Sequence, residues 1–262
     1  PTVSVTGPNS PSASADADMT VTSSDGGSGL ASTTCTIDGS ATTCGDALAD
    51  LAEGSHTYVA TATDDAGNSA SDSYTWLVDI TNPTVSISDT PAAETNSQAA
   101  DVTVTSADGG SGLASTTCTI DGGATTCGDA LANLADGSHS YVATATDDAG
   151  NSASATFTWY VDITDPSPSV DSGPSDPTNS NSATFTTSAT DDYSLASKTC
   201  SLDGDSLNCG ATTDNLAAGS HTFQVLAIDT AGNSATASFT WFIDNTDPTV
   251  SIDANPSDPS ND

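Results

Sequence analysis

Aspartate is the residue type in this sequence whose number and spacing point most clearly to chemistry. The chain of 262 residues has 35 Asp and Glu residues against a single Lys or Arg, which gives a formal net charge of −34. Carboxylates that converge repel one another, by about 1 kcal/mol for a pair at about 4 Å in water and about 4 kcal/mol at an effective dielectric near 20. Because the chain has almost no cationic side chains, a divalent cation is the expected partner of such a cluster, and hard oxygen ligands without His favour Ca²⁺.

Cysteine is the second residue type whose spacing carries chemistry. Six Cys form three pairs with members nine positions apart, in CTIDGSATTC, CTIDGGATTC and CSLDGDSLNC. If Gly39 and Ser40 form the turn of a β-hairpin, Cys35 and Cys44 become a non-hydrogen-bonded pair, which brings Cα atoms close enough for a disulfide. Free thiols or a metal pair are the alternative, although no CxxC spacing occurs. The predicted disulfides are Cys35–Cys44, Cys118–Cys127 and Cys200–Cys209, and they indicate an oxidising, extracellular compartment.

The cysteine pairs mark three near-copies of one unit with a period of 82 to 83 residues. Each copy ends in a similar aromatic segment: YTWLVD, FTWYVD or FTWFID. The expected repeats are residues 1–82, 83–165 and 166–247, and residues 248–262 are expected to begin a fourth with its first strand, TVSI. A sequence that stops within a unit is expected to be a section of a longer array.

Within each copy the apolar residues recur with the period of a β-strand. Tyr58, Ala60 and Ala62 fall on one face of residues 56–64 and Thr residues on the other, and Trp76 and Val78 share a face in the next segment. DDAGN joins these two segments as a hairpin turn, and residues 45–54 are expected to be a loop or a single helical turn. About seven short strands per copy predict an all-β fold of tandem immunoglobulin-like β-sandwiches arranged end to end, with one hairpin disulfide per repeat.

This topology predicts where the acidic residues meet. Each linker, DITNP (79–83) or DITDP (162–166), should enter the next repeat at the end that carries its second-to-third-strand loop and its final hairpin loop. We therefore predict two junction sites for Ca²⁺. The candidate ligands are Asp79, Asn82, Asp108, Asp147 and Asp148 at the first junction and Asp162, Asp165, Asp191, Asp192 and Asp229 at the second. Asn151 and Asn233 are weaker candidates, and the alternative is that Asp simply fills turns and keeps the surface solvated.

Other functions find little support in the sequence. A chain with this charge offers no basic patch for nucleic acid, and no apolar run is long enough to span a bilayer, so neither nucleic acid nor membrane insertion is expected. His56, His139 and His221 occupy one register before a strand, and with no nucleophile elbow nearby we interpret them as structural rather than catalytic. Sugar stacking on the Trp residues and a surface-binding Thr array are less favoured alternatives. No catalytic residue is predicted, and the chain is not expected to be an enzyme.

The combined pattern resembles a known group of proteins. The motifs C-x-L/I-D-G…C, L-x-x-G-S-H-T-Y/F, A-T-D-x-A-G-N and W-x-V/I-D-x-T-x-P are similar to those of tandem bacterial Ig-like repeats in giant cell-surface adhesins and other secreted repeat proteins. In related calcium-dependent repeats, Asp residues of the linker and adjoining loops rigidify a rod, which implies this role for Asp79, Asp108, Asp147 and their counterparts. The sequence departs from the pattern at Asn82, where later linkers have Asp, and at Thr230, which replaces the second Asp of DDAGN.

The expected function is therefore structural. We predict an extracellular, cell-surface stalk or filament segment whose partners are neighbouring repeats of the same chain and, beyond them, other copies in a filament or a host or biofilm surface. One alternative is an adhesive module that binds glycans or a host protein, and its binding surface would be sought in the divergent third repeat. Another is a set of accessory repeats of a secreted enzyme. Residues 248–262 could also add a strand to a neighbouring subunit.

Overall fold

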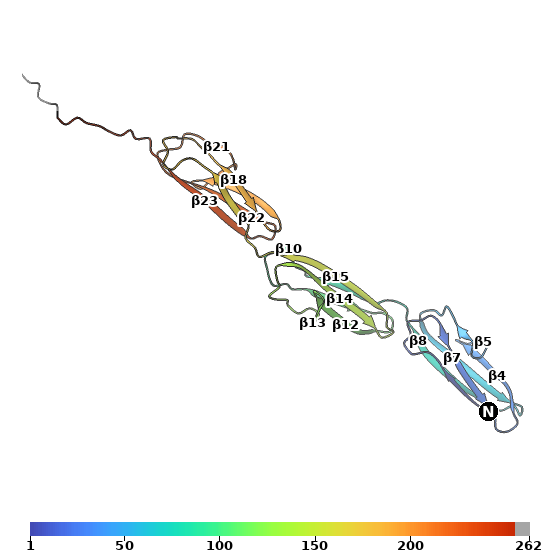
Figure 1. Cartoon of the computed structure of the whole chain (residues 1–262). Helices are drawn as coiled ribbons and strands as arrows, with labels where there is room; N and C mark the ends of the chain where they lie inside the picture. Colours follow the sequence, from blue (N-terminus) through green and yellow to red (C-terminus); the bar gives the residue numbers. More distant parts are fainter. Residues whose placement is uncertain (255–262) are drawn as a thin grey trace, which may run out of the picture. The chain divides into compact units, whose positions relative to one another are not determined.

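A computed structural model describes residues 1–254 of the chain, and every regular element in this part is a β-strand (Figure 1). The predicted all-β fold is confirmed. None of the described elements is a helix that is long and apolar enough to cross a membrane.

The strands fall into three successive sets. The first set is β1 (Thr2–Thr6), β2 (Ala17–Asp18), β3 (Thr20–Ser24), β4 (Leu30–Ile37), β5 (Ser40–Thr42), β6 (Ala47–Leu48), β7 (Gly54–Asp64) and β8 (Ser69–Val78). The second is β9 (Thr84–Ser88), β10 (Glu94–Thr95), β11 (Thr103–Ala107), β12 (Leu113–Ile120), β13 (Gly123–Thr125), β14 (Gly137–Asp147) and β15 (Ser152–Val161). The third is β16 (Ser167–Ser172), β17 (Ala183–Thr184), β18 (Thr186–Thr190), β19 (Leu195–Leu202), β20 (Asp205–Leu207), β21 (Thr212–Thr213), β22 (Gly219–Asp229) and β23 (Ser234–Ile243).

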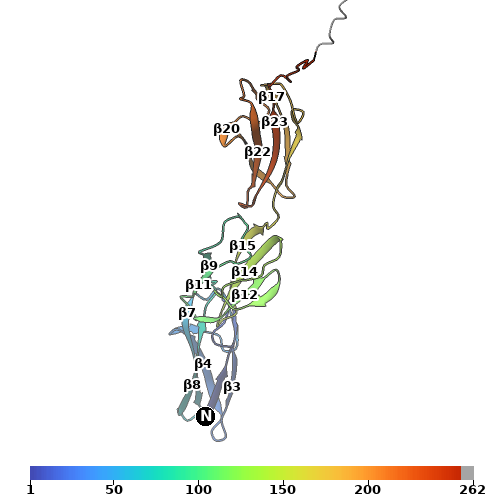
Figure 2. The same cartoon turned by 90° about the vertical axis from the view of Figure 1, so that its left-hand side faces the viewer.

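Each set forms two layers with the same topology. One layer contains four antiparallel strands in the order β5-β4-β7-β8, and β20-β19-β22-β23 repeats it. In the second set the order is β13-β12-β14-β15, with β10 as a fifth strand beside β15. The other layer pairs β1 with β3, β9 with β11, or β16 with β18. In the first repeat β1 packs on β7 and β8, which closes the sandwich, and the long hairpins β7–β8 and β22–β23 are visible in Figures 1 and 2.

By contacts the described chain divides into two compact units. One contains residues 1–93 and 98–160, and the other contains residues 94–97 and the described residues from 161 onward. The repeat boundaries expected at 82/83 and 165/166 stay a prediction, and we use them as names for repeats one, two and three.

The core of each sandwich comes from the alternation seen in the sequence. Along β7, Tyr58, Ala60 and Ala62 are fully buried, and Trp76 and Val78 of β8 are 1% exposed. Since fully burying a large apolar side chain contributes about 1.5–3 kcal/mol, these few aromatic residues supply much of the stability of a small repeat. In repeat three Phe185 and Phe223 are both buried and stack at 3.9 Å between ring centroids.

The three predicted disulfides are confirmed, but the hairpin register predicted for them is wrong. Cys35 lies opposite Thr42, not Cys44, because Asp38 and Gly39 form the turn, with φ of 47° and 81°. A two-residue turn with positive φ at both central positions matches the twist of the strands, and Asp-Gly supplies it better than Gly-Ser. Cys44 lies two residues past Thr42, and its Cα atom is still only 5.2 Å from that of Cys35. The same pairing joins Cys118 to Cys127 and Cys200 to Cys209, and a loop this short is worth about 2–3 kcal/mol.

Two expectations about less regular segments need correction. Residues 45–54 contain the short strand β6 and no helical turn. The strand expected at residues 249–252 is absent from the described part of the chain, where Val250 and Ile252 are 94% and 85% exposed. An isolated strand has no partner for its backbone groups, which explains its absence. The rest of the predicted fourth repeat, residues 255–262, lies outside the described residues.

Candidate metal centres

The first acidic centre lies in the compact unit of residues 1–93 and 98–160, where three strands end at one place. Asp79 follows the last residue of β8, Asp108 follows β11, and Asp147 is the last residue of β14. One carboxylate oxygen from each lies within 4.8 Å of the others. Asp79 is 2% and Asp147 is 1% exposed. The sequence prediction that this linker meets these two loops therefore agrees with the geometry.

Backbone amides hold the two loop carboxylates of this centre. Asp108 Oδ2 accepts from the amides of Gly110 and Gly112 at 3.0 and 2.8 Å. Asp147 Oδ1 accepts from the amides of Gly150 and Asn151 at 2.7 and 2.8 Å. The Asn151 side-chain amide donates to Asp147 Oδ2 and to the backbone carbonyl of Asp79, both at 2.8 Å. Asn151, a weaker candidate ligand from the sequence, thus fastens the linker to the loop.

Asp79 is seated against the second-to-third-strand loop of repeat two. Its Oδ2 accepts from the Ser111 amide at 2.6 Å and its Oδ1 from the Thr81 amide at 3.2 Å. Gly110 permits this approach, because a Cβ on it would lie 2.5 Å from the Asp79 carboxylate carbon. Hydrogen bonds from Ser111 outweigh burial and lower the pKa of Asp79. Sequence reasoning missed both Gly110 and Ser111, since nothing in GGSG shows which residue will touch the linker.

The second acidic centre, in the other unit, repeats this plan. Asp162 follows β15, Asp191 follows β18, and Asp229 ends β22, with one oxygen of each again within 4.8 Å of the others. Asp191 Oδ2 accepts from the Tyr193 and Ser194 amides, and Asn233 donates to Asp229 Oδ2 at 2.8 Å and to the Asp162 carbonyl at 2.7 Å.

The two centres differ in how the linker carboxylate is satisfied. Asp162 is 1% exposed, and its Oδ1 accepts from Thr164 at 3.0 Å. Its Oδ2 has no hydrogen-bond donor among residues 1–254, whereas Asp79 Oδ2 has Ser111. Burial, followed by repulsion from Asp191, Asp229 and Asp192, raises the pKa of Asp162.

Carboxylate oxygens without a hydrogen-bond donor are the feature of both centres that favours cation binding. Within the described chain Asp108 Oδ1, Asp162 Oδ2 and Asp191 Oδ1 are buried without a hydrogen-bond partner. A buried charge without a partner is costly, and protein carboxylates in this state are paired or bind metals. Lys198 does not serve, because its ammonium donates to the Thr187 carbonyl at 2.8 Å. Three carboxylates and nearby carbonyls form an oxygen donor set that fits Ca²⁺.

The remaining predicted ligands lie outside the two carboxylate groups. Asn82, Asp148, Asp165 and Asp192 are all exposed. Asp148 contributes its backbone amide, which donates to the Gly112 carbonyl at 2.9 Å. Adjacent residues of a turn point in different directions, so one Asp of each pair enters the centre while its neighbour faces solvent.

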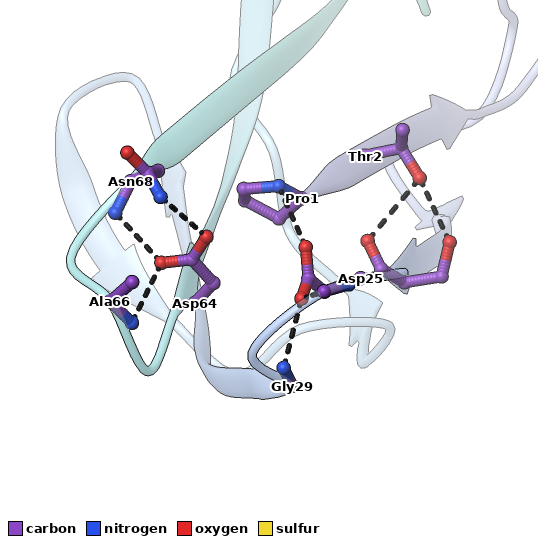
Figure 3. A network of polar contacts seen from close by, with 9 residues as sticks. Pro1, Thr2, Asp25, Gly29, Asp64, Ala66 and Asn68 are labelled. Atoms are coloured by element: carbon purple, nitrogen blue, oxygen red, sulfur yellow. Dashed lines mark hydrogen bonds and ion pairs between the residues drawn. The ribbon is translucent and has the colours of Figure 1, made fainter.

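Repeat one contains the same two loops, which sequence reasoning did not single out (Figure 3). Asp25 Oδ2 accepts from the Gly27 and Gly29 amides at 2.9 Å each. Asp64 accepts from the Asn68 amide and side chain at 2.8 Å each. Asp25 Oδ1 lies 3.2 Å from the backbone nitrogen of Pro1. Shifting the sequence by 83 residues from Asp108 and Asp147 would have located both residues.

The three His residues are structural in a specific sense. His56 Nδ1 lies 2.7 Å from Asp38 Oδ2, and its Nε2 lies 2.7 Å from the Ala52 carbonyl. Both ring nitrogens therefore act as donors, which requires the charged imidazolium and leaves no nitrogen to act as a base. The bonds to Ala52 and Asp38 raise the pKa of His56 despite its burial. His139 with Asp121 and His221 with Asp203 repeat the arrangement, and their pKa values are also raised.

Comparisons with known proteins agree with this fold. A family model described as "Bacterial Ig-like domain (group 3)" matches residues 46–128. No curated protein sequence matches the chain. The predicted resemblance to tandem bacterial Ig-like repeats is confirmed.

Among solved structures, the chain is similar to three N-terminal domains of the bacteriophage RB49 highly immunogenic outer capsid protein Hoc. The identity is 13%, the TM-score is 0.41, and the match covers 94% of this chain and 99% of that one. It is also similar to the N-terminal eight Ig domains of Down syndrome cell adhesion molecule, with 15% identity, a TM-score of 0.47 and coverage of 82% and 33%. Mouse cadherin-23 EC22-24 gives 17% identity, a TM-score of 0.37 and coverage of 86% and 90%. At these TM-scores we base no functional conclusion on the likenesses.

Proposed function

We propose that this chain, which resembles tandem bacterial Ig-like repeats, is a structural section of an extracellular protein whose two acidic centres bind Ca²⁺. The observation that supports the proposal is that each of the two centres has a buried carboxylate oxygen without a hydrogen-bond donor. Three disulfides favour an oxidising compartment outside the cytoplasm. In that compartment calcium is abundant enough for modest sites, which in extracellular modules bind at about 10⁻⁴ to 10⁻³ M.

The proposed role of the ion is to fix each linker to the repeat that follows it. Asp79 already contacts Ser111, and Asn151 already holds its carbonyl, so the ion adds charge neutralisation to a seated segment. With a Kd of about 10⁻³ M, 10 mM Ca²⁺ stabilises the folded unit by about 1.4 kcal/mol. The function is then reach and stiffness of a stalk or filament.

Amide NMR spectra of the chain during a CaCl₂ titration test this proposal one centre at a time. We expect saturable shifts at Ser111 for the first centre and at Ser194 for the second. Asp79→Asn should abolish the first set and leave the second, and Asp162→Asn should do the reverse. Asp148→Asn and Asp165→Asn are matched controls, because these exposed acids lie outside the carboxylate groups. Linear, unsaturated shifts at both serines, or equal effects of the controls, would overturn the calcium assignment.

The mechanical part of the proposal has its own measurement. Small-angle scattering in Ca²⁺ and then in excess chelator should show a broader distribution of particle lengths after chelation, because unscreened carboxylates loosen the linkers. An unchanged distribution, together with saturable calcium binding, would leave the ion bound but without a stiffening role.

An adhesive module is the second candidate, and the exposed aromatic residues of repeat three favour it. Phe242 on β23 is 48% exposed and Tyr193 is 42% exposed. Glycan arrays with the chain would separate the candidates, since reproducible binding lost in Phe242→Ala would support adhesion and uniform absence of binding would support the structural role.

A further inference from the structure

The outer face of the four-stranded layer in repeat three carries a hollow that lies apart from the acidic centres. Its volume is 410 Å³, and it is lined by residues of β19, β20, β22 and β23, three of which are labelled in Figure 2. Phe223 and Val225 of β22 are fully buried, so Gln224 and Leu226, which alternate with them, face outward. The outward side chains that line the hollow are Thr199, Ser201, Ser206, Gln224, Leu226 and Thr236.

The strand register arranges these six side chains in two rows across the sheet. One row consists of Thr199, Leu226 and Thr236, and the other consists of Ser206, Ser201 and Gln224. Leu226 is half-buried in the middle of its row, and Gln224 is exposed. One apolar side chain is therefore surrounded by hydroxyl groups and one amide.

Three of the six positions carry a different kind of residue in repeats one and two. The same register places Val at the position of Gln224, Thr at that of Leu226 and Ala at that of Ser206. These residues are Val59, Thr61 and Ala41 in repeat one and Val142, Thr144 and Ala124 in repeat two. Repeat three therefore differs from the other two in where this face places its apolar and its hydrogen-bonding groups.

The replacement of Thr by Leu226 leaves a hydroxyl group of repeat three without its partner. In repeat one the hydroxyls of Thr61 and Ser71 lie 2.8 Å apart, and repeat two has the same pair. Leu226 has no hydroxyl, so Thr236 opposite it cannot form this bond. Within residues 1–254 the Gln224 amide and the hydroxyls of Thr236 and Ser201 have no hydrogen-bond partner in the protein. Each of these groups can both donate and accept a hydrogen bond.

The charge of the chain and the lining of the hollow restrict the class of ligand. Among the described residues that line the hollow none is charged and none is aromatic. A chain with a net charge of −34 repels anions, and the lining offers no carboxylate to a cation. The ligand that fits is uncharged and rich in hydroxyl groups, with a small apolar face for Leu226. The volume lies within the range of about 300–1,000 Å³ of small-ligand pockets.

We propose that this hollow binds a neutral saccharide unit, with ring C–H groups packed on Leu226 and hydroxyl groups hydrogen-bonded to Gln224 and Ser201. The binding is separate from the calcium centres and adds a ligand site to the structural role of the chain. A shallow site on a sheet face predicts weak binding, with a Kd of about 10⁻³ M.

Amide NMR spectra of the whole chain, titrated with cellobiose, maltose, lactose and diacetylchitobiose, test the proposal. At least one of these sugars should cause saturable shifts at Leu226 and Thr236, and the shifts should persist in excess chelator. The corresponding amides of repeat one, Thr61 and Ser71, should not respond, and neither should any of the four under glucuronate. The proposal is overturned if none of the neutral sugars gives saturable shifts, if repeat one responds equally, or if glucuronate binds as well.

Two variants restore side chains that repeats one and two carry in the same register, so the sheet accommodates them. Gln224→Val and Leu226→Thr should each weaken sugar binding about tenfold or more. Phe242→Ala is the control, because Phe242 does not line the hollow. Binding that survives Gln224→Val, or that is lost in Phe242→Ala, would place the sugar elsewhere and overturn the assignment. Failure here leaves the calcium proposal standing, because neither acidic centre takes part in the test.

Discussion

Replacing Gly110 by Ala is the sharpest test of how the first centre is built. The new Cβ would lie 2.5 Å from Cγ and Oδ2 and 2.6 Å from Oδ1 of Asp79, closer than real carbon contacts. Gly110 is not among the glycines with positive φ, so Ala is compatible with the backbone and the perturbation is purely steric.

The magnitude follows from the two ways in which the clash can be relieved. If Asp79 stays, overpacking costs about 1–3 kcal/mol. If Asp79 moves, it loses the charge-assisted bond from Ser111, worth about 1.5–3 kcal/mol. Reduced freedom of the unfolded chain returns about 0.4–1 kcal/mol. We expect a net loss of about 1–2 kcal/mol in the free energy of unfolding and a calcium affinity at the first centre lowered about tenfold or more.

Urea unfolding in chelator, together with the calcium titration read at Ser111, measures both effects. Gly27→Ala is the matched control, because it makes the same change in the same turn of repeat one with only an ordinary contact to Asp25. Its stability should lie within about 0.5 kcal/mol of the parent chain, or slightly above it. Equal behaviour of the two variants would refute the seating of Asp79 on Gly110.

Two further predictions concern charge. In chelator, Asp162→Asn should raise the free energy of unfolding by about 1 kcal/mol, because Asp162 Oδ2 lacks a hydrogen-bond donor. Asp79→Asn should lower it by about 1 kcal/mol, because the Ser111 amide favours the charged carboxylate. Urea unfolding measures both changes, and changes of the same sign would contradict the difference between the two linker carboxylates. Because the pKa of His56 is raised in the folded state, its contribution to the free energy of unfolding is complete below a pH of about 6.5 and is lost as the pH rises through the folded pKa. The free energy of unfolding then falls by at most about 1.4 kcal/mol per pH unit for each His. Unfolding between pH 6 and 9 should show this decline for the parent chain and a shallower one for His56→Gln. The lowered pKa of Asp38 predicts a second loss in acid, as pH falls below about 3.9 and through the folded pKa.

The sequence was sufficient for the fold because its patterns are local and repeated. Alternation along residues 56–64 fixes the buried face, and the repeated Cys spacing fixes the disulfides even though the predicted register was wrong by the position of one turn. The turn is formed by Asp38 and Gly39, which both have positive φ, whereas the sequence prediction placed it at Gly39 and Ser40. The convergence of Asp79, Asp108 and Asp147 was also predictable, since it needs only the order of strand ends in a sandwich.

The contacts that distinguish the two centres depend instead on one loop whose length changes. The loop after β11 has Gly109, Gly110, Ser111 and Gly112 before Leu113, whereas the loop after β18 has one residue fewer and places Tyr193 two residues after its Asp. In both loops the residue two positions after the Asp donates to it, through Gly110 or Tyr193. In repeat three the next amide, of Ser194, also donates to Asp191, so no Ser111-like amide reaches the linker and Asp162 Oδ2 is left without a donor. A single deletion therefore converts a linker carboxylate that is satisfied by the protein into one that depends on a cation. The stability of the unit that contains the second centre should therefore respond more strongly to calcium than that of the unit that contains the first.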